Sequence, residues 1–378
     1  MPGPLDGVVV TELAGLGPAP FAGMVLSDLG AKVIRIDRAV PGGLFDPSPN
    51  DLLARGRLSV AIDLKRPEGV EVALRCVTAS DALIEGFRPG VTERMGLGPA
   101  VCLARNPRLV YGRMTGWGQE GPLATSAGHD IDYIALSGAL HPIGTPEAPI
   151  PPLNLVGDFG GGGMLLVVGI LAAIVHARAT GTGQVVDAAM VDGSALLSTS
   201  HHGYIADGWW APTRQSNLLD GAAPFYGVYE TADGEHVAVG ALEPQFFAAL
   251  IEGLGLDPGD VGPQHERSGW ERMRALFASR FAERTREEWA VHFEGTDACV
   301  APVLSLTEAP GHPHNRARST FVEVGGVVQP APAPRFDVTP GAIGSAPASP
   351  GRDSDEVLAW LGFSSNEIGK LRESKAVA

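Results

Sequence analysis

The sequence predicts an α/β protein in which a large domain with an open, mostly parallel sheet is joined to a smaller α+β domain. Short β-branched runs alternate with amphipathic helical stretches in the first half of the chain, the pattern of a parallel sheet. The second half instead opens with a hairpin signal and continues into helices. With 378 residues, 44% of them hydrophobic and 19% charged, the chain is long enough for two ordinary cores.

Strands and helices alternate along the first half. "GVVVTEL" predicts a short strand, "FAGMVLSDLG" a helix that ends on a glycine, and "AKVIRID" a second strand. The expected strands cover residues 7–13, 31–37, 58–64, 81–87 and 108–118, with helices over 21–30 and 67–80. A further strand and helix share residues 181–200.

The first strand–helix–strand unit has some features of a dinucleotide site. Asp37 follows Gly15 and Gly17 by about 20 residues, the spacing at which an acid holds a ribose in dinucleotide folds. A proline stands where the third glycine of that fingerprint belongs, so the fingerprint fails. Arg35 and Arg38 flank Asp37, which indicates instead that a phosphate is recognised here.

The composition changes after residue 208. Residues 209–224 are irregular and predict a crossover between domains. Residues 225–242 predict an antiparallel hairpin that turns at Asp233-Gly234, followed by helices near 244–254, 269–283 and 285–294. The expected domain boundaries are 1–208 for the large domain, 209–224 for the crossover, 225–324 for the small domain, and 325–378 for a return linker with C-terminal helices that rejoin the large domain.

Charge and cysteines restrict the partners and the compartment. A net charge of −15 argues against nucleic acid or an anionic membrane as a partner, since both need a basic face. Cys76, Cys102 and Cys299 are odd in number and far apart, which indicates thiols in a reducing cytoplasm. No secretory signal is expected. The apolar run from Met164 to Val175 is shorter than the roughly 20 residues of a bilayer span, so no membrane insertion is expected.

Residues 156–163, "VGDFGGGG", place Asp158 beside four consecutive glycines. The stretch lacks the lysine and hydroxyl residue of a phosphate loop, and its glycines lack dinucleotide spacing. It predicts a helix N-terminus without side chains, where free backbone N–H groups face a ligand. Asp158 would then touch the same bound group. The alternative is that Asp158 only caps the helix.

The stretch "AGHDIDY" supplies the second candidate. His129, Asp130 and Asp132 have the composition of a metal site, but they alternate in direction and no other histidine or cysteine lies at ligand spacing, so no metal is expected. His129 is then either a catalytic or a structural histidine. Glu243 ends a strand just before Pro244 begins a helix, and by itself it predicts a solvated acid.

Together these motifs carry a resemblance. The chain contains, in order, "VTELAGLGPAPFAGMVLSDLGAKVIRIDR", "LIEGFRPGVTERMGLGP", "RMTGWGQEGP", "AGHDIDYIALSG", "NLVGDFGGGG", "GQVVDAAMVDG", "VAVGALEPQF", "DACVAPV" and "DSDEVLAWLGFS". It resembles the α-methylacyl-CoA racemases, within the family III CoA-transferase superfamily, over nearly its whole length. The resemblance implies an interlaced homodimer, in which each chain has a large Rossmann-like domain and a small domain joined by two long crossings.

The resemblance also implies which residues contact CoA. CoA arrives as part of the acyl-CoA substrate, and no other cofactor is expected. The charge-rich stretch 55–66, "RGRLSVAIDLKR", is then a basic strip suited to the phosphates of CoA. The implied CoA contacts are Arg38, Ile62, Asp63, Leu64, Lys65, Gly86, Phe87, Arg88, Arg94, Gly128, Asp130 and Tyr133.

The implied reaction inverts the α-carbon of a 2-methylacyl-CoA thioester, which makes the chain an isomerase. By matching position, His129 and Asp158 are the two proton-transfer residues, and Glu243 is the acid that pairs with His129. Removing the α-hydrogen forms an enolate, and inversion needs a second proton carrier on the opposite face. A dry pocket must raise the pKa of Asp158 above the roughly 3.9 of a free aspartate before it can donate near neutral pH. The helix that follows the glycines would stabilise the enolate oxygen.

Two other functions use the same residues. A CoA-transferase of the same superfamily would use Asp158 alone, as a nucleophile that forms a mixed anhydride. His129 and Glu243 would then lack a role. A CoA-binding protein without turnover is the other alternative, because a fold alone does not fix function.

Overall fold

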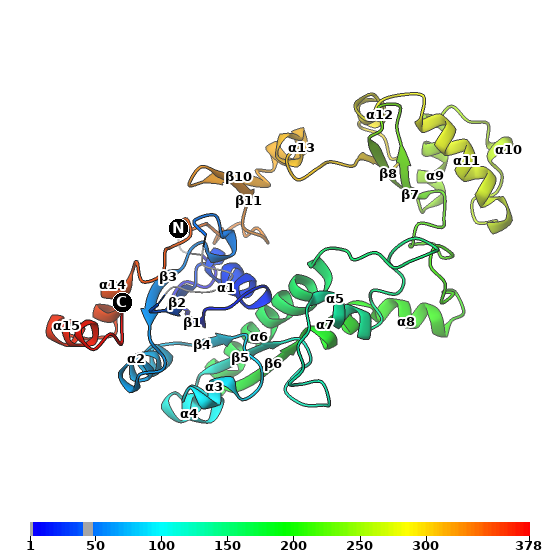
Figure 1. The fold of residues 1–378 in the computed structure, drawn as a ribbon. Helices are drawn as coiled ribbons and strands as arrows, with labels where there is room; N and C mark the ends of the chain where they lie inside the picture. Colours follow the sequence, from blue (N-terminus) through cyan, green and yellow to red (C-terminus); the bar gives the residue numbers. More distant parts are fainter. Residues whose placement is uncertain (1–2, 41–47) are drawn as a thin grey trace. The chain divides into compact units, whose positions relative to one another are not determined.

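The computed structural model describes residues 3–40 and 48–378, and these divide into two compact units. Of the described residues, the first unit comprises 3–40, 48–139, 152–198 and 314–378, and the second comprises 140–151 and 199–313. Figure 1 follows the chain through both by colour. Each unit has its own hydrophobic core, so each is described separately.

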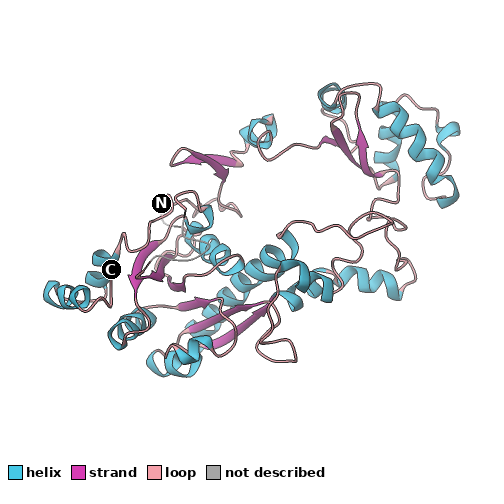
Figure 2. Ribbon diagram, viewed as in Figure 1, coloured by secondary structure: helices cyan, strands magenta, loops and turns pink. Residues whose placement is uncertain are grey.

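A six-stranded parallel sheet forms the centre of the first unit (Figure 2), which confirms the predicted fold class. Its strands are β1 Val9–Leu13, β2 Lys32–Arg38, β3 Leu58–Ile62, β4 Ala82–Glu85, β5 Val110–Thr115 and β6 Gln184–Ala189. They lie in the order β3-β2-β1-β4-β5-β6. The order reverses direction between β1 and β4, and such a switch point leaves a crevice at the carboxyl ends of the strands.

Helices cover both faces of this sheet, which explains why its strands are apolar on both sides. The helices of the unit are α1 Pro18–Asp28, α2 Pro67–Thr78, α3 Val91–Arg94, α4 Pro99–Arg105, α5 Asp130–Leu136, α6 Leu165–Thr180, α7 Met190–Leu197, α14 Ser354–Trp360 and α15 Ser365–Glu373. Helices α1 and α6 pack on one face. Helices α2, α4 and the C-terminal α14 and α15 pack on the other. Ser364 and Glu367 form a capping box at the start of α15.

The glycine stretch is helical, which corrects the predicted helix start. A π-helix runs over Leu155–Met164 and continues directly into α6. By length and composition alone, the continuous helix Leu155–Thr180 could cross a membrane. It packs against β5 and β6, however, which is the position of a core helix in an α/β unit. The longer apolar helix arises because the glycines extend it rather than precede it.

A three-stranded antiparallel sheet with an aromatic core forms the second unit. Its strands are β7 Tyr226–Glu230, β8 His236–Gly240 and β9 Val300–Pro302. Its helices are α8 Thr199–Ala206, α9 Pro244–Gly253, α10 Pro258–Val261, α11 Trp270–Phe281 and α12 Arg286–Phe293. The predicted hairpin is present, and Gly234 takes the positive φ of 76° that its turn requires.

Two segments fall in different units from those the sequence suggests. Strands β10 Phe321–Val324 and β11 Val327–Pro330 form a hairpin, with the short helix α13 Pro313–Ala317 before it, and the expected boundary at 324 cuts through the hairpin turn. Arg55 donates to Gln329 Oε1 at 2.8 Å and to the Pro330 carbonyl, which fastens the hairpin to the first unit. Residues 140–151 join the second unit, where Arg214 donates to the Thr145 carbonyl at 2.8 Å.

Candidate active site

A cavity of about 210 Å³ lies at the carboxyl ends of β4 and β5, beside the loop that follows β1. We call it the crevice cavity. It is lined by five residues implied as CoA contacts, namely Gly86, Phe87, Arg88, Gly128 and Tyr133. These residues come from two separate stretches of the sequence, and the parallel sheet brings them to one edge. The switch point of the sheet is where doubly wound α/β proteins bind their ligands.

The wall of the cavity is built around one aromatic pair. The rings of Trp117 and Tyr133 meet edge to face, with centroids 4.7 Å apart. A Cβ at Gly116 would lie 2.0 Å from the Tyr133 ring, and one at Gly128 would lie 2.7 Å from it. The two glycines therefore make room for the buried ring. Burial raises the pKa of Tyr133, helped by the negative charges of Asp158 and Asp132.

His129 lies immediately before α5, as the N-cap residue of that helix. Its backbone N–H donates to Asp132 Oδ2 at 2.9 Å, which closes the first turn, and its side chain is exposed. The same helix directs Tyr133 into the crevice cavity. The backbone of His129 is therefore fixed next to the cavity-lining Gly128, and its imidazole is accessible, as proton transfer requires.

Asp158 lies in the first turn of the π-helix and is half-buried. Its Oδ2 accepts a hydrogen bond of 3.1 Å from the side-chain amide of Asn154. Burial raises the pKa of Asp158, an effect that Asn154 and His129 oppose and Asp130 reinforces. The N-cap of the helix is Asn154, so Asp158 is not a cap. A carboxyl group with a raised pKa is suited to both accepting and donating a proton.

The start of α1 approaches the same carboxylate. Gly17, the N-cap of α1, has a φ of 67°, which glycine adopts readily and other residues rarely do. A Cβ at this position would lie 3.3 Å from Asp158 Oδ2. The motif "GLGP" therefore brings a helix N-terminus next to Asp158, where the helix dipole favours negative charge.

The four glycines at 160–163 pack against neighbouring helices, so the prediction that they expose backbone N–H groups to a ligand is wrong. A Cβ at Gly161 would lie 2.7 Å from the Ser194 nitrogen, and one at Gly193 would lie 1.8 Å from the Gly161 carbonyl oxygen. A Cβ at Gly163 would lie 2.7 Å from Phe21. The run of glycines thus allows α1 and α7 to approach the π-helix closely.

Asp130 does not face the solvent as a CoA contact would. Its side chain is buried, and its Oδ1 accepts a hydrogen bond of 2.6 Å from the backbone N–H of Asp158. The structure therefore assigns the carboxylate to an internal contact and corrects the implied CoA contact for this side chain.

The remaining implied CoA contacts divide into two groups. The side chains of Arg38, Lys65 and Arg94 are exposed. Arg38 is the last residue of β2, and Lys65 follows the carboxyl end of β3. In the "IDL" stretch 62–64, Ile62 is buried, whereas Asp63 and Leu64 are half-buried. Ile62 is only 2% exposed in the core, its backbone bridges to Val377, and Leu64 packs on the same core. Asp63 forms an ion pair with Arg66 at 3.3 Å. CoA contacts at these three positions stay a prediction.

The basic strip at 55–66 is mostly internal. Arg57 is 1% exposed and pairs with Glu12 at 3.0 Å. Arg55 is buried and pairs with Asp28 at 2.5 Å. Each guanidinium is therefore neutralised inside the first unit, because a buried charge requires a partner. Only the end of the strip, at Lys65 and Arg66, can meet phosphate.

Arg35 and Asp37 are likewise internal. Arg35 Nε donates to Asp37 Oδ2 at 2.9 Å, and the Ser59 hydroxyl donates to the same oxygen. Both side chains of the pair are buried. The expectation of phosphate recognition at Arg35 is therefore wrong, whereas the neighbouring Arg38 is exposed.

A buried ion pair beneath the crevice cavity was not anticipated from the sequence. Glu85 ends β4, accepts from the Phe87 backbone N–H at 2.7 Å and pairs with Arg113 at 3.0 Å. Arg113 also contacts Glu93 at 3.0 Å. Burial raises the pKa of Glu85 to about 7, although the Phe87 N–H and Arg113 act to lower it. The pair fixes the loop that carries Phe87 and Arg88. The signal in the sequence was a charged residue inside each of two apolar strands.

Glu243 is the N-cap residue of α9 in the second unit, and its side chain is exposed. His129 belongs to the first unit. Their pairing stays a prediction. Among residues 3–40 and 48–378, no three His, Cys, Asp or Glu side chains gather as metal ligands.

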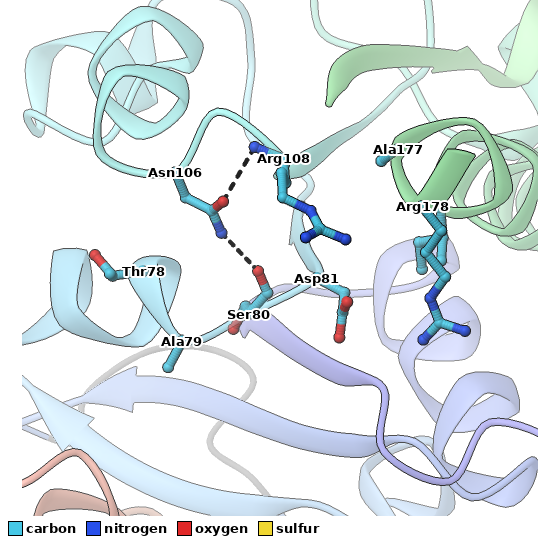
Figure 3. Close-up of a pocket in the computed structure, with 9 residues that line it drawn as sticks. Thr78, Ala79, Ser80, Asp81, Asn106, Arg108, Ala177 and Arg178 are labelled. Carbon is cyan, nitrogen blue, oxygen red and sulfur yellow. Dashed lines mark hydrogen bonds between the residues drawn. The ribbon is translucent and has the colours of Figure 1, made fainter. Parts of the chain in front are cut away.

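A second cavity, of about 200 Å³, lies at the amino ends of β4 and β5 (Figure 3). The Asn106 side chain holds it together, since it donates to the Ser80 carbonyl at 2.8 Å and accepts from the Arg108 backbone N–H at 3.1 Å. Asp81 accepts from the Val9 backbone N–H at 2.9 Å. These hydrogen bonds connect the turns that precede β4 and β5 with the start of β1. The cavity lies at the opposite edge of the sheet from His129 and Asp158.

Comparison with known proteins agrees with this geometry. Residues 5–355 match the sequence family described as CoA-transferase family III. The chain belongs to CoA-transferase family III. It is 48% identical to alpha-methylacyl-CoA racemase from Mus musculus and 46% identical to that from Homo sapiens, in each case over 99% of this chain and 97% of the relative. The crystal structure of a CAIB/BAIF family protein from Brucella suis is similar in fold, with a TM-score of 0.81 and 25% identity over 96% of this chain and 100% of that one.

The similarity to these relatives covers the residues of the candidate site. The curated relatives extend over nearly the whole chain, including the stretches that carry His129, Asp158 and Glu243. The family resemblance stated from the motifs is thus confirmed, and so is the mixed α/β architecture.

Proposed function

We propose that this chain is an isomerase that inverts the α-carbon of 2-methylacyl-CoA thioesters. The observation that carries the proposal is that His129, which follows the cavity-lining Gly128 in the chain, is close enough to Asp158 to act on its pKa, on a chain so similar in sequence to the two racemases. His129 affects the pKa of Asp158 electrostatically, so the two groups share one environment. Two different proton carriers near one cavity are what inversion requires.

The proposed reaction proceeds by two proton transfers. One of the two groups removes the α-proton, and the electron pair of the C–H bond moves into the thioester to give an enolate. The other group then donates a proton to the opposite face of the same carbon, which leaves the thioester intact and inverted. The raised pKa of Asp158 keeps its carboxyl able to act in both directions. At the end of each turnover both groups have exchanged their protonation states.

CoA is proposed to bind along the carboxyl edge of the sheet. Arg88, Arg94, Arg38 and Lys65 are exposed cations that suit its phosphates. They are a local positive edge on a chain of net charge −15, so substrate binding should weaken with salt. No other cofactor takes part in the proposed reaction.

The active form is proposed to be a homodimer. Helix α6 and the last residue of the π-helix, Met164, expose an apolar stripe, with Val168 57% and Val175 70% exposed in the single chain; Ala172 completes it. Such a stripe on a core helix is suited to burial against a second copy. Light scattering should give twice the chain mass of 39.3 kDa, and a stable, active monomer would contradict the proposal.

The three unpaired cysteines support a cytoplasmic location.

A CoA-transferase reaction is the second candidate, because the half-buried Asp158 could also attack a thioester carbonyl. The two reactions differ in what they exchange. In deuterated water, a racemase incorporates deuterium at the α-carbon of a 2-methylacyl-CoA whether or not a free acid is present. A transferase moves CoA to an added free acid and leaves the α-hydrogen in place. Transfer without deuterium uptake would refute the proposed function, and the absence of both would indicate a binding protein.

A further inference from the structure

One carboxylate connects the two elements that carry the proposed proton carriers. Asp130 is the first residue of α5, directly after His129. Its Oδ1 accepts a hydrogen bond of 2.6 Å from the backbone N–H of Asp158, 28 residues along the chain. The bond is charge-assisted and therefore stronger than a bond between neutral groups.

The surroundings of Asp130 are built to hold this contact. The residue is only 8% exposed, and a Cβ at Gly157 would lie 2.5 Å from Asp130 Oδ1. Glycine at 157 therefore leaves the space that the carboxylate occupies. Within the described part of the chain, the second oxygen, Oδ2, is buried without a hydrogen-bond partner. A buried oxygen without a hydrogen-bond partner costs folding free energy. If position 130 had only a structural role, a side chain with an amide or a hydroxyl would fit it better.

We infer that Asp130 is a positioning residue, which ties the start of α5 to the π-helix and thereby sets the separation between His129 and Asp158. The inference rests on the proposed function. An inverting pair must reach the same carbon from opposite faces, and small errors in such geometry are expensive in rate. Asp130 also adds a negative charge beside Asp158. The other groups around the Asp158 carboxyl are Asn154, His129 and Tyr133.

Two substitutions separate the hydrogen bond from the charge. Asp130→Asn keeps a side-chain oxygen that can accept from the Asp158 N–H, but it removes the charge. Asp130→Ala removes both. Asp130→Ala should lower kcat for both enantiomers at least about tenfold with little change in KM. Asp130→Asn should retain most of kcat and move the pH limb that belongs to Asp158 to lower pH, because a charge that raises its pKa is gone.

A glycine pair on the π-helix provides the matched control. Gly157→Ala should displace the Asp130 carboxylate and reproduce the kinetics of Asp130→Ala. Gly160→Ala lies on the same helix, and its nearest neighbours are the Leu155 carbonyl at 3.1 Å and the Leu197 side chain at 3.3 Å, away from Asp130. Gly160→Ala therefore measures the effect of crowding the π-helix without displacing Asp130, and it should lower kcat less than Gly157→Ala does.

Hydrogen exchange gives a readout that does not depend on activity. Peptides covering 130–136 and 155–164 should exchange faster in Asp130→Ala than in Asp130→Asn, provided that both variants melt as folded proteins. If the unchanged protein exchanges no α-hydrogen, the proposed function fails while this structural test still stands. Equal impairment of the Asn and Ala variants, or an Ala variant with unchanged kcat and exchange, overturns the positioning role.

Discussion

Glu85 provides a test of the buried network beneath the crevice cavity, through the substitution Glu85→Gln. The Glu85 side chain is 1% exposed, and burial raises its pKa from 4.5 to about 7. The folded protein therefore holds a proton at this position more tightly than the unfolded chain does. The stability that this proton provides is complete below pH 4.5 and is lost as the pH rises through 7.

The magnitude follows from the two pKa values. One pKa unit corresponds to about 1.36 kcal/mol, so the full shift is worth about 3 kcal/mol, of which about 2.5 kcal/mol falls between pH 5 and pH 8. Glutamine keeps the shape and can still accept from the Phe87 N–H, but it does not titrate. The free energy of unfolding of Glu85→Gln should therefore rise relative to the unchanged protein by about 2.5 kcal/mol from pH 5 to pH 8.

Urea unfolding at several pH values and one fixed protein concentration measures this difference, since stability in an oligomer depends on concentration. Glu93→Gln is the control. Glu93 contacts the same Arg113 but is exposed, and its pKa is lowered although partial burial acts to raise it. The control should show no gain at high pH. A difference between Glu85→Gln and the unchanged protein that is flat with pH would refute the raised pKa of Glu85.

Three other predictions concern packing, CoA binding and the acid in the second unit. Gly193→Ala should destabilise the protein by more than about 3 kcal/mol in thermal unfolding, because its Cβ would overlap the Gly161 carbonyl. Gly203→Ala on α8, which has open space around its Cβ, should not destabilise it. Equal melting temperatures for the two variants would contradict the packing role of Gly193. Arg88→Ala should raise KM for acyl-CoA about tenfold and reduce its salt dependence with kcat nearly unchanged, and a KM that does not move would remove Arg88 from the CoA site. Glu243→Gln should preserve CoA binding but lower kcat and move the acidic limb of the pH profile down, and an unchanged profile would leave Glu243 a solvated acid.

The sequence predicted the sheet well because the apolar runs that build it are local. Each strand of the first unit lies within or beside the run that predicts it, and the hairpin at Gly234 follows from its turn residues. The strand order is not local, since it depends on which strands pair across the sheet. The β10–β11 hairpin is local, but it escaped detection because strands of only four residues carry little periodic signal. The small-domain boundary was therefore set too late.

The residues of the candidate site came from the family resemblance, because residue type alone left His129 and Asp158 open between catalytic and structural roles. Arg88 and Tyr133 line the crevice cavity, and His129 follows Gly128, which also lines it. The catalytic roles of His129 and Asp158 stay predictions. The prediction that Arg57 belongs to a basic strip for CoA phosphates was wrong, because its partner Glu12 is 45 residues away and nothing near Arg57 in the sequence indicates burial.

The glycine run misled for a related reason. Absence of a side chain leaves room either for a ligand or for another backbone, and the sequence cannot distinguish the two. Here the room is taken by α7, at Gly193, and by Phe21 of α1. The carboxylate beside the run, Asp158, is half-buried, and its role in proton transfer stays a prediction.

The central claim is that His129 and Asp158 each serve one face of the same α-carbon. Each single enantiomer of a 2-methylacyl-CoA should be incubated in deuterated water with the unchanged protein, with His129→Ala and with Asp158→Ala, and both inversion and deuterium content followed by chiral separation and mass spectrometry. The unchanged protein should invert both enantiomers with deuterium uptake, while each variant loses inversion and retains at most the exchange of one enantiomer, a different one for each variant. Full racemisation by either single variant would contradict the two-base account.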